Sequence, residues 1–196
     1  MNKSQLTRMH ILQEAFALIY SNGYRSTSID DIIARTNVTK GAFFYHFKSK
    51  DDMGLAVINE VMFPKMYEGL FAGLQTSAHP DRDLYKVFEL LLMKHPLLKP
   101  ELGCPAGNLT QEMASLNTDF NAALKDMTDA WQKVIVKAVG NGKKTGVFRK
   151  DVKPAEVALM LMSGYWGVRN FGKLENSRAP YKVYLKSLKS YLKSLQ

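Results

Sequence analysis

Hydrophobic residues recur every three or four positions along most of the chain, with polar residues between them. This spacing places the apolar side chains on one face of an α-helix and is typical of helices that bury that face. No segment of the sequence alternates with the two-residue period of a half-buried β-strand. The pattern therefore predicts an all-α fold with about nine helices in total.

The first fifty residues predict one long helix and two short ones. The long helix should end at Asn22-Gly23, since both residues tolerate the left-handed conformation of a helix C-terminus. Ser28 and Asp31 form the pattern of a capping box that opens the second helix, and Thr39 can cap a third over residues 40–47. Two short helices joined by a tight turn and packed on a longer one form a helix-turn-helix unit. The apolar stripe of the long helix consists of Leu6, Met9, Leu12, Phe16 and Ile19.

A second capping box, from Ser49 to Asp52, predicts the start of a fourth helix and of a larger helical body. We therefore place one domain at residues 1–50 and a second at residues 51–196. A kink is expected at Pro64, because proline lacks the N–H that its helical turn needs. The apolar stripe of this fourth helix consists of Leu55, Ile58, Met62, Met66 and Leu70.

Further along the body, residues 77–80, 100–105 and 140–146 are expected to be loops, the last because it contains three glycines. Two helices should follow, at about 155–171 and 180–195, the first of them opened by Pro154. That helix is apolar on nearly all sides and needs more cover than one chain readily supplies. We therefore expect both helices to form a four-helix bundle with those of a second copy.

The formal net charge of +9 fits a polyanionic partner such as DNA. Residues 1–50 contain seven basic and three acidic residues, a net charge of +4, and every charge between Ile32 and Lys50 is positive. A basic surface that is merely solvated has the same composition, so charge alone leaves both interpretations open. The lysines at the other end of the chain are interpreted as the outer face of a dimerising helix; they are Lys182, Lys186, Lys189 and Lys193.

Several functional classes are disfavoured by the composition. No apolar run approaches the roughly 18 residues that span a bilayer, and the N-terminus lacks the apolar core of a secretion signal. One cysteine excludes an intramolecular disulfide and a multi-cysteine metal site, and the four histidines form no catalytic or metal-binding pattern. We therefore expect a soluble cytoplasmic protein that is not an enzyme, with no cofactor, metal or membrane partner.

The segment from Asn37 to Lys50 resembles the signature of the TetR (tetracycline-repressor) family. The resemblance is specific because it includes Tyr45-His46-Phe47 and then Lys50 at the spacing of the family, and it extends from about Leu6 to Leu55. It is weaker in the body, where Gly146-Val147-Phe148-Arg149 leads to Pro154. The family implies an all-helical homodimer in which a three-helix domain binds DNA and a helical domain binds ligand and dimerises.

The resemblance also implies roles for individual residues. Thr27, Ser28, Thr39 and Lys40 match positions that meet phosphates or base edges, and Gly41 allows close approach to DNA. Tyr45 and His46 match backbone contacts, and Lys50 matches a phosphate clamp. Phe44 stands where the family usually has tyrosine, so a hydroxyl contact is lost there. Ala42 stands where serine or threonine is common, so base recognition there can be apolar, as to a thymine methyl.

The body is expected to bind a small, largely apolar effector within residues of about 85–170. Aromatic side chains there suit an apolar or aromatic guest, and polar ones could orient it; the candidates are Trp131, Tyr165, Trp166, Asn108, Glu112 and Arg169. Cys104 precedes a short helix, where its thiol is either reactive or buried and inert.

These observations predict a ligand-responsive transcriptional regulator, a repressor that binds a palindromic double-stranded DNA operator as a homodimer. A small apolar, aromatic or electrophilic effector would release it. The alternative is a constitutive DNA-binding protein without a small-molecule effector.

Overall fold

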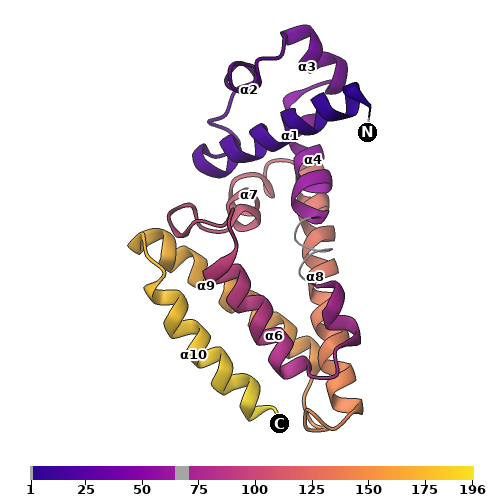
Figure 1. The fold of residues 1–196 in the computed structure, drawn as a ribbon, viewed down its shortest axis with the longest axis vertical. Helices are drawn as coiled ribbons and strands as arrows, with labels where there is room; N and C mark the ends of the chain where they lie inside the picture. Colours follow the sequence, from indigo (N-terminus) through magenta and orange to yellow (C-terminus); the bar gives the residue numbers. More distant parts are fainter. Residues whose placement is uncertain (1, 65–70) are drawn as a thin grey trace. The chain divides into compact units, whose positions relative to one another are not determined.

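The computed structural model describes residues 2–64 and 71–196, and every regular element in these ranges is helical (Figure 1). Nine α-helices lie within these residues, with short π and 3-10 segments, which confirms the all-α prediction. Packing divides the chain into two units. The N-terminal unit comprises Met1–Lys65 with Pro105–Asp126, and the C-terminal unit comprises Met66–Cys104 with Met127–Gln196. The functional boundary expected at residue 50 remains a prediction.

The first helices form as the capping pattern predicts. Helix α1 (Lys3–Asn22) ends at Gly23, which has a φ of 90° and donates its N–H to Ile19 O. Helix α2 (Ile29–Thr36) opens with the expected capping box, because the Ser28 hydroxyl accepts from the Asp31 amide and the Asp31 carboxylate accepts from the Ser28 amide. The C-cap Asn37 is left-handed, with a φ of 54°, and turns the chain toward the next helix.

Helix α3 (Lys40–His46) is capped by Thr39, whose hydroxyl accepts from the Ala42 amide at 3.1 Å. It ends one residue earlier than expected. Helix α4 (Lys50–Ala56) begins at Ser49, but its capping box is only half formed. Asp52 accepts from the amide of Lys48 rather than from that of Ser49, so the reciprocal bond is displaced by one residue.

A π-helical segment, Val57–Met62, continues α4 and precedes Pro64. Met66 and Leu70, the last members of the predicted stripe, lie outside the described residues, so the kink at Pro64 remains a prediction. The later elements of the N-terminal unit are α7 (Pro105–Met113) and the first part of α8 (Thr118–Lys144).

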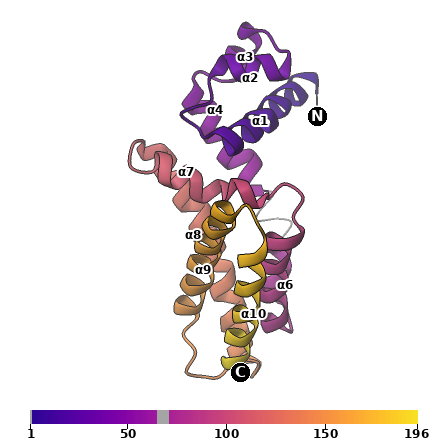
Figure 2. The same cartoon turned by 90° about the vertical axis from the view of Figure 1, so that its left-hand side faces the viewer.

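The C-terminal unit contains the rest of α8 with α6 (Pro80–Glu89), α9 (Pro154–Glu175) and α10 (Ala179–Ser194). Helix α10 packs against both α6 and α9 (Figure 2). A π-helical segment, Leu90–Lys94, extends α6, and 3-10 segments lie at Ala72–Thr76 and Pro100–Leu102. Pro80 begins α6 instead of ending a loop, because proline fits the first turn of a helix, where no N–H partner is needed.

The expected loop at 140–146 is wrong, because α8 continues to Lys144. Gly142 allows Phe148 and Pro80 to pack closely against α8, because a Cβ at this position would lie 2.5 Å from the Phe148 ring and 2.8 Å from Pro80. The chain turns only at Gly146, which has a φ of 78°. The Gly142 carbonyl then accepts from the amides of Val147 and Phe148, at 2.8 and 3.1 Å.

Two glycines of α8 provide a matched test of this packing. Gly142→Ala should lower the free energy of unfolding by about 1–3 kcal/mol, since an added methyl overpacks the Phe148 contact. Gly140→Ala should be neutral or stabilising by up to about 1 kcal/mol, because alanine favours the helix and nothing lies within 4 Å of its Cβ. Urea unfolding of both variants measures the difference, and equal midpoints would contradict this account of the helix end.

Candidate nucleic-acid interface

The rotation of α3 is set by two phenylalanines one helical turn apart. Phe43 is 0% exposed and Phe47 is 1% exposed, and their ring centroids are 5.5 Å apart. The Arg8 guanidinium lies 4.8 Å from the Phe47 ring centroid. Because these rings face the core, the residues between them face solvent. Helix α3 therefore presents a fixed outer surface.

This outer surface contains most of the residues that the family resemblance assigned to DNA. Thr39, Lys40 and Gly41 are exposed at the start of α3. Phe44 and Tyr45 are exposed by 45% and 76%, so both aromatic rings are accessible to a partner. Ala42 and His46 are half-buried beside them.

The threonine and serine before α2 are placed differently from each other. Thr27 is 1% exposed and donates its hydroxyl to Gly23 O at 2.8 Å, so its side chain is not on the surface. Ser28 is exposed, and its hydroxyl donates to the Asp31 carboxylate at 2.6 Å. This bond lowers the pKa of Asp31. Ser28 thus lies at the helix start, while Thr27 stabilises the turn before it.

Two contacts hold the Lys50 side chain at the start of α4. Its ammonium lies 4.5 Å from the centroid of the Tyr24 ring and donates to Arg25 O at 3.5 Å. A cation over an aromatic face is attracted by the ring quadrupole. Burial lowers the pKa of Lys50, and the carboxylates of Asp51 and Glu112 oppose that shift. The lysine therefore has a defined position before any partner binds.

A network missed by the sequence prediction surrounds Tyr24. Its hydroxyl donates to Asp51, and the Asn117 side-chain amide donates to the other oxygen of Asp51 at 3.1 Å. Burial, together with the bond to Asp51, raises the pKa of Tyr24. Phe120 packs on the Tyr24 ring with centroids 4.9 Å apart. Tyr24 and Asp51 lie within the stretch of family resemblance, from about Leu6 to Leu55, but no sequence pattern joined them to Asn117 or Phe120.

Glu112 also has a role that its sequence context did not indicate. Its carboxylate accepts from the backbone amides of Tyr24 and Arg25, at 2.8 and 2.6 Å. The residue expected to anchor an effector is thus bonded to the turn between α1 and α2. Asn108, the other predicted anchor on α7, belongs to the same N-terminal unit.

The remaining effector candidates lie in the C-terminal unit. Trp131 and Tyr165 are in contact, with centroids 5.3 Å apart, and Phe71 and Phe88 pack on Trp131 at 5.6 and 6.2 Å. The indole N–H of Trp131 is buried and has no hydrogen-bond partner among residues 2–64 and 71–196. Trp166 is half-buried on α9.

Arg169 is fully buried and donates to the carbonyls of Lys99 and Gly103, and its guanidinium lies 5.5 Å from the Tyr181 ring centroid. Cys104, which follows Gly103, is 2% exposed. Among the described residues, no group of histidine, cysteine and carboxylate side chains is arranged to hold a metal ion. No described helix combines the length and apolar character needed to cross a membrane.

Comparison with known proteins identifies the family. The model of the tetR family of bacterial regulatory proteins matches residues 11–57, and that of the tetracyclin repressor-like C-terminal domain matches residues 83–188. The chain belongs to the TetR family. It is therefore a transcriptional regulator with a helix-turn-helix DNA-binding domain, in a family whose members are typically dimers.

Relatives match along most of the chain and are regulators rather than enzymes. The HTH-type transcriptional repressor DhaR of Mycobacterium sp. strain GP1 is 28% identical over 179 residues, which cover 91% of this chain and 88% of DhaR. An HTH-type regulator of Lactococcus lactis is 33% identical over 154 residues, 79% of this chain and 78% of that protein. A TetR regulator structure from Chloroflexus aurantiacus matches with a TM-score of 0.86 and 27% identity, covering 98% of this chain and 97% of that one.

Two lysines near the end of α3 test the interface. Lys50→Ala should weaken binding to all DNA sequences alike and reduce the slope of log K against log salt by about 0.9, the value for one phosphate. Lys48→Ala removes the same charge from an exposed side chain and should change the slope less. Fluorescence anisotropy at several salt concentrations measures both. The placement of Lys50 would be contradicted by equal slopes for both variants.

Proposed function

We propose that this protein is a repressor that binds a palindromic operator as a homodimer and that a small, largely apolar effector releases it. The observation that carries the proposal is the pairing of an outward-facing α3 surface with a buried aromatic cluster, in which the indole N–H of Trp131 has no partner in the part of the chain that the structure describes. The α3 surface suits DNA, and the aromatic cluster suits a ligand. DhaR, and NemR of Escherichia coli, are described as transcriptional repressors, which supports repression here.

In this proposal α3 lies in the major groove. Thr39 and Lys40 meet phosphates or base edges, Gly41 permits close approach, and Ala42 and Phe44 contact apolar groups such as the thymine methyl. Tyr45, His46 and Lys50 contact the backbone, with Ser28 at the start of α2. Thr27 contributes indirectly, because its buried hydroxyl stabilises the turn before α2.

The homodimer is proposed to form through α9 and α10. Large apolar side chains on these helices remain exposed: Met160 by 57%, Phe171 by 59%, Leu174 by 83% and Val183 by 68%. The three on α9 recur at spacings that place them on one face of the helix. A single chain rarely leaves so many neighbouring apolar groups in water, and such patches mark interfaces.

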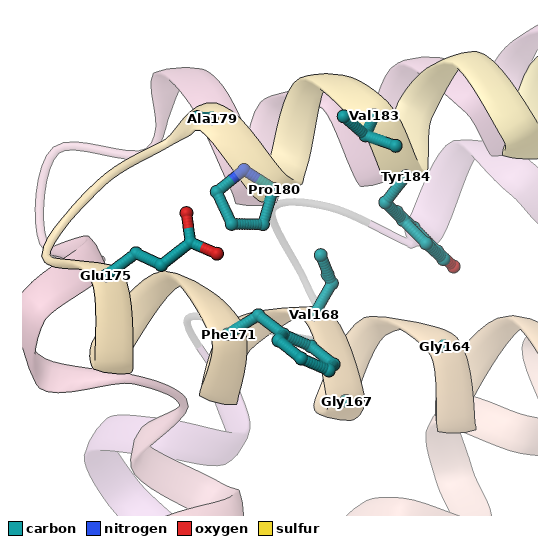
Figure 3. A pocket seen from close by; sticks show the side chains of 9 residues that line it. All are labelled: Gly164, Gly167, Val168, Phe171, Glu175, Ala179, Pro180, Val183 and Tyr184. Carbon is teal, nitrogen blue, oxygen red and sulfur yellow. The ribbon is translucent and has the colours of Figure 1, made fainter.

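A groove of about 550 Å³ between α9 and α10 is lined by two of these side chains, Phe171 and Val183 (Figure 3). Two of its lining residues are glycines with different surroundings. A Cβ on Gly164 would lie 2.7 Å from the Tyr184 ring, whereas a Cβ on Gly167 would have nothing within 4 Å. Among the described residues, therefore, none fills the space over Gly167. A second copy is the occupant that fits, because one symmetric patch then supplies both the hollow and the projecting Phe171.

Gly167→Leu should weaken dimerisation at least tenfold, because it fills the groove without a clash inside its own chain. Gly140→Leu, at the similarly open position on α8, is the control and should leave the dimer intact. Sedimentation equilibrium measures both dissociation constants. Unchanged dimerisation of the Gly167 variant, or a wild-type monomer that binds its operator fully, would overturn this part of the proposal.

The effector is proposed to bind at the aromatic cluster around Trp131. A buried donor without a partner costs about 1–3 kcal/mol, and a ligand acceptor such as a carbonyl oxygen would remove that cost. Tyr165 would pack against the ligand, while Trp166 and Arg169 lie on the same helix, α9. Asn108 and Glu112 belong to the N-terminal unit, where Glu112 binds the turn at residues 23–25, and they are not part of this proposed site. Release requires a ligand that prefers the non-binding conformation, by about 1.4 kcal/mol for each tenfold shift in population.

Trp131→Phe removes this N–H while keeping an aromatic ring. It should weaken binding of carbonyl-containing aromatic compounds roughly fivefold, the equivalent of about 1 kcal/mol, and leave their hydrocarbon analogues unaffected. A thermal-shift screen finds the compounds, and anisotropy with a selected operator measures release. If no compound both stabilises the protein and releases DNA, the constitutive DNA-binding function is favoured instead.

An electrophilic effector would instead modify Cys104. With only 2% of the residue exposed, its thiol would react through local opening of the surrounding helices. Cys104 immediately precedes α7, so an added group would displace the start of that helix.

A further inference from the structure

The turn at residues 23–25 is bound by a carboxylate from a distant part of the chain. Glu112 on α7 accepts from the amides of Tyr24 and Arg25. A Cβ on Gly23 would lie 3.3 Å from one Glu112 oxygen, so the carboxylate also lies close against the first residue of the turn. Hydrogen bonds to an ionised acceptor are about twice as strong as neutral ones.

The same turn holds Lys50. The ammonium of Lys50 lies over the Tyr24 ring and donates to the carbonyl of Arg25. Glu112 and Lys50 thus contact the same two residues, Glu112 through their amides and Lys50 through a ring and a carbonyl. A movement of residues 23–25 would therefore change both contacts of Lys50, the one with the Tyr24 ring and the one with the Arg25 carbonyl.

A second connection leads from the start of α8 to the start of α4. Asn117 donates to Asp51, the residue after Lys50, and its side-chain oxygen accepts from the amides of Asp119 and Phe120 at 2.9 and 3.2 Å. Phe120 packs against Gly54, where a Cβ would lie 2.6 Å from the ring. Residues 112–120 therefore bind both the turn and α4.

We propose that Glu112 is a positioning residue for DNA binding, which sets the place of the Lys50 ammonium through the backbone of the 23–25 turn. Displacement of α7 then removes a phosphate contact without any direct contact between α7 and DNA. The inference rests on the proposed role of Lys50. Through this role of Glu112, a displacement within residues 105–126 would change the position of Lys50 on the DNA-binding surface.

The test compares Glu112→Ala with Lys50→Ala and with the double variant, by operator binding at several salt concentrations. Glu112→Ala should reduce the salt slope by about 0.9 and the affinity roughly eightfold at 0.1 M salt, as loss of one phosphate contact does. The double variant should lose no more than Lys50→Ala alone. A purely structural role would lower the thermal midpoint and leave the slope at its wild-type value.

Two further variants keep the test decisive. Asp126→Asn removes an exposed carboxylate from α8 in the same unit and should leave the slope unchanged. Glu112→Gln retains an acceptor for one of the two amides and should fall between wild type and Glu112→Ala. If Glu112→Ala does not fold, the Gln variant decides: non-additivity with Lys50→Ala supports the inference and additivity overturns it.

The salt slopes of the two single variants distinguish the positioning role of Glu112 from the phosphate contact of Lys50. A lowered slope for Lys50→Ala with a wild-type slope for Glu112→Ala overturns the positioning role alone. A wild-type slope for Lys50→Ala overturns the phosphate contact itself, and the positioning role with it.

Discussion

The burial of Phe43 and Phe47 is the interaction on which the DNA-binding surface depends. Removing each ring from water contributes about 1.5–3 kcal/mol, and together the rings fix the rotation of a helix only two turns long. Everything that α3 presents to DNA follows from that rotation, including the exposure of Phe44 and Tyr45. A helix this short has little stability of its own, so its geometry is a product of packing.

The elements predicted well from sequence are those fixed by local chemistry. Gly23, the Ser28–Asp31 capping box and Thr39 each act within about four residues, and all three lie where the pattern indicated. The glycines of 140–146 were misread as a loop, because the reason for Gly142 is a contact with Phe148 that no local pattern reveals.

The residues of the candidate nucleic-acid interface were likewise predictable where a local sequence pattern marks them, but their long-range contacts were not. Family resemblance located the outer surface of α3, where Thr39, Lys40, Gly41, Phe44 and Tyr45 are exposed and Ala42 and His46 are half-buried. It could not reveal that Thr27 is buried. Nor could it reveal the bond from Glu112 to Tyr24, which joins residues 88 positions apart and depends on the packing of α7. The helix caps of the DNA-binding unit are thus encoded locally, whereas the contacts between its distant segments depend on packing.

Two copies of this chain are proposed to recognise one DNA site. Selection of binding sequences from a random duplex library, followed by measurement of the stoichiometry on the selected duplex, tests it most directly. We expect an inverted repeat whose half-sites lie about 34–36 Å apart, or a multiple of that helical repeat, with an even number of chains bound. Recovery of a single asymmetric site bound by one chain, or of no preferred sequence, would contradict it.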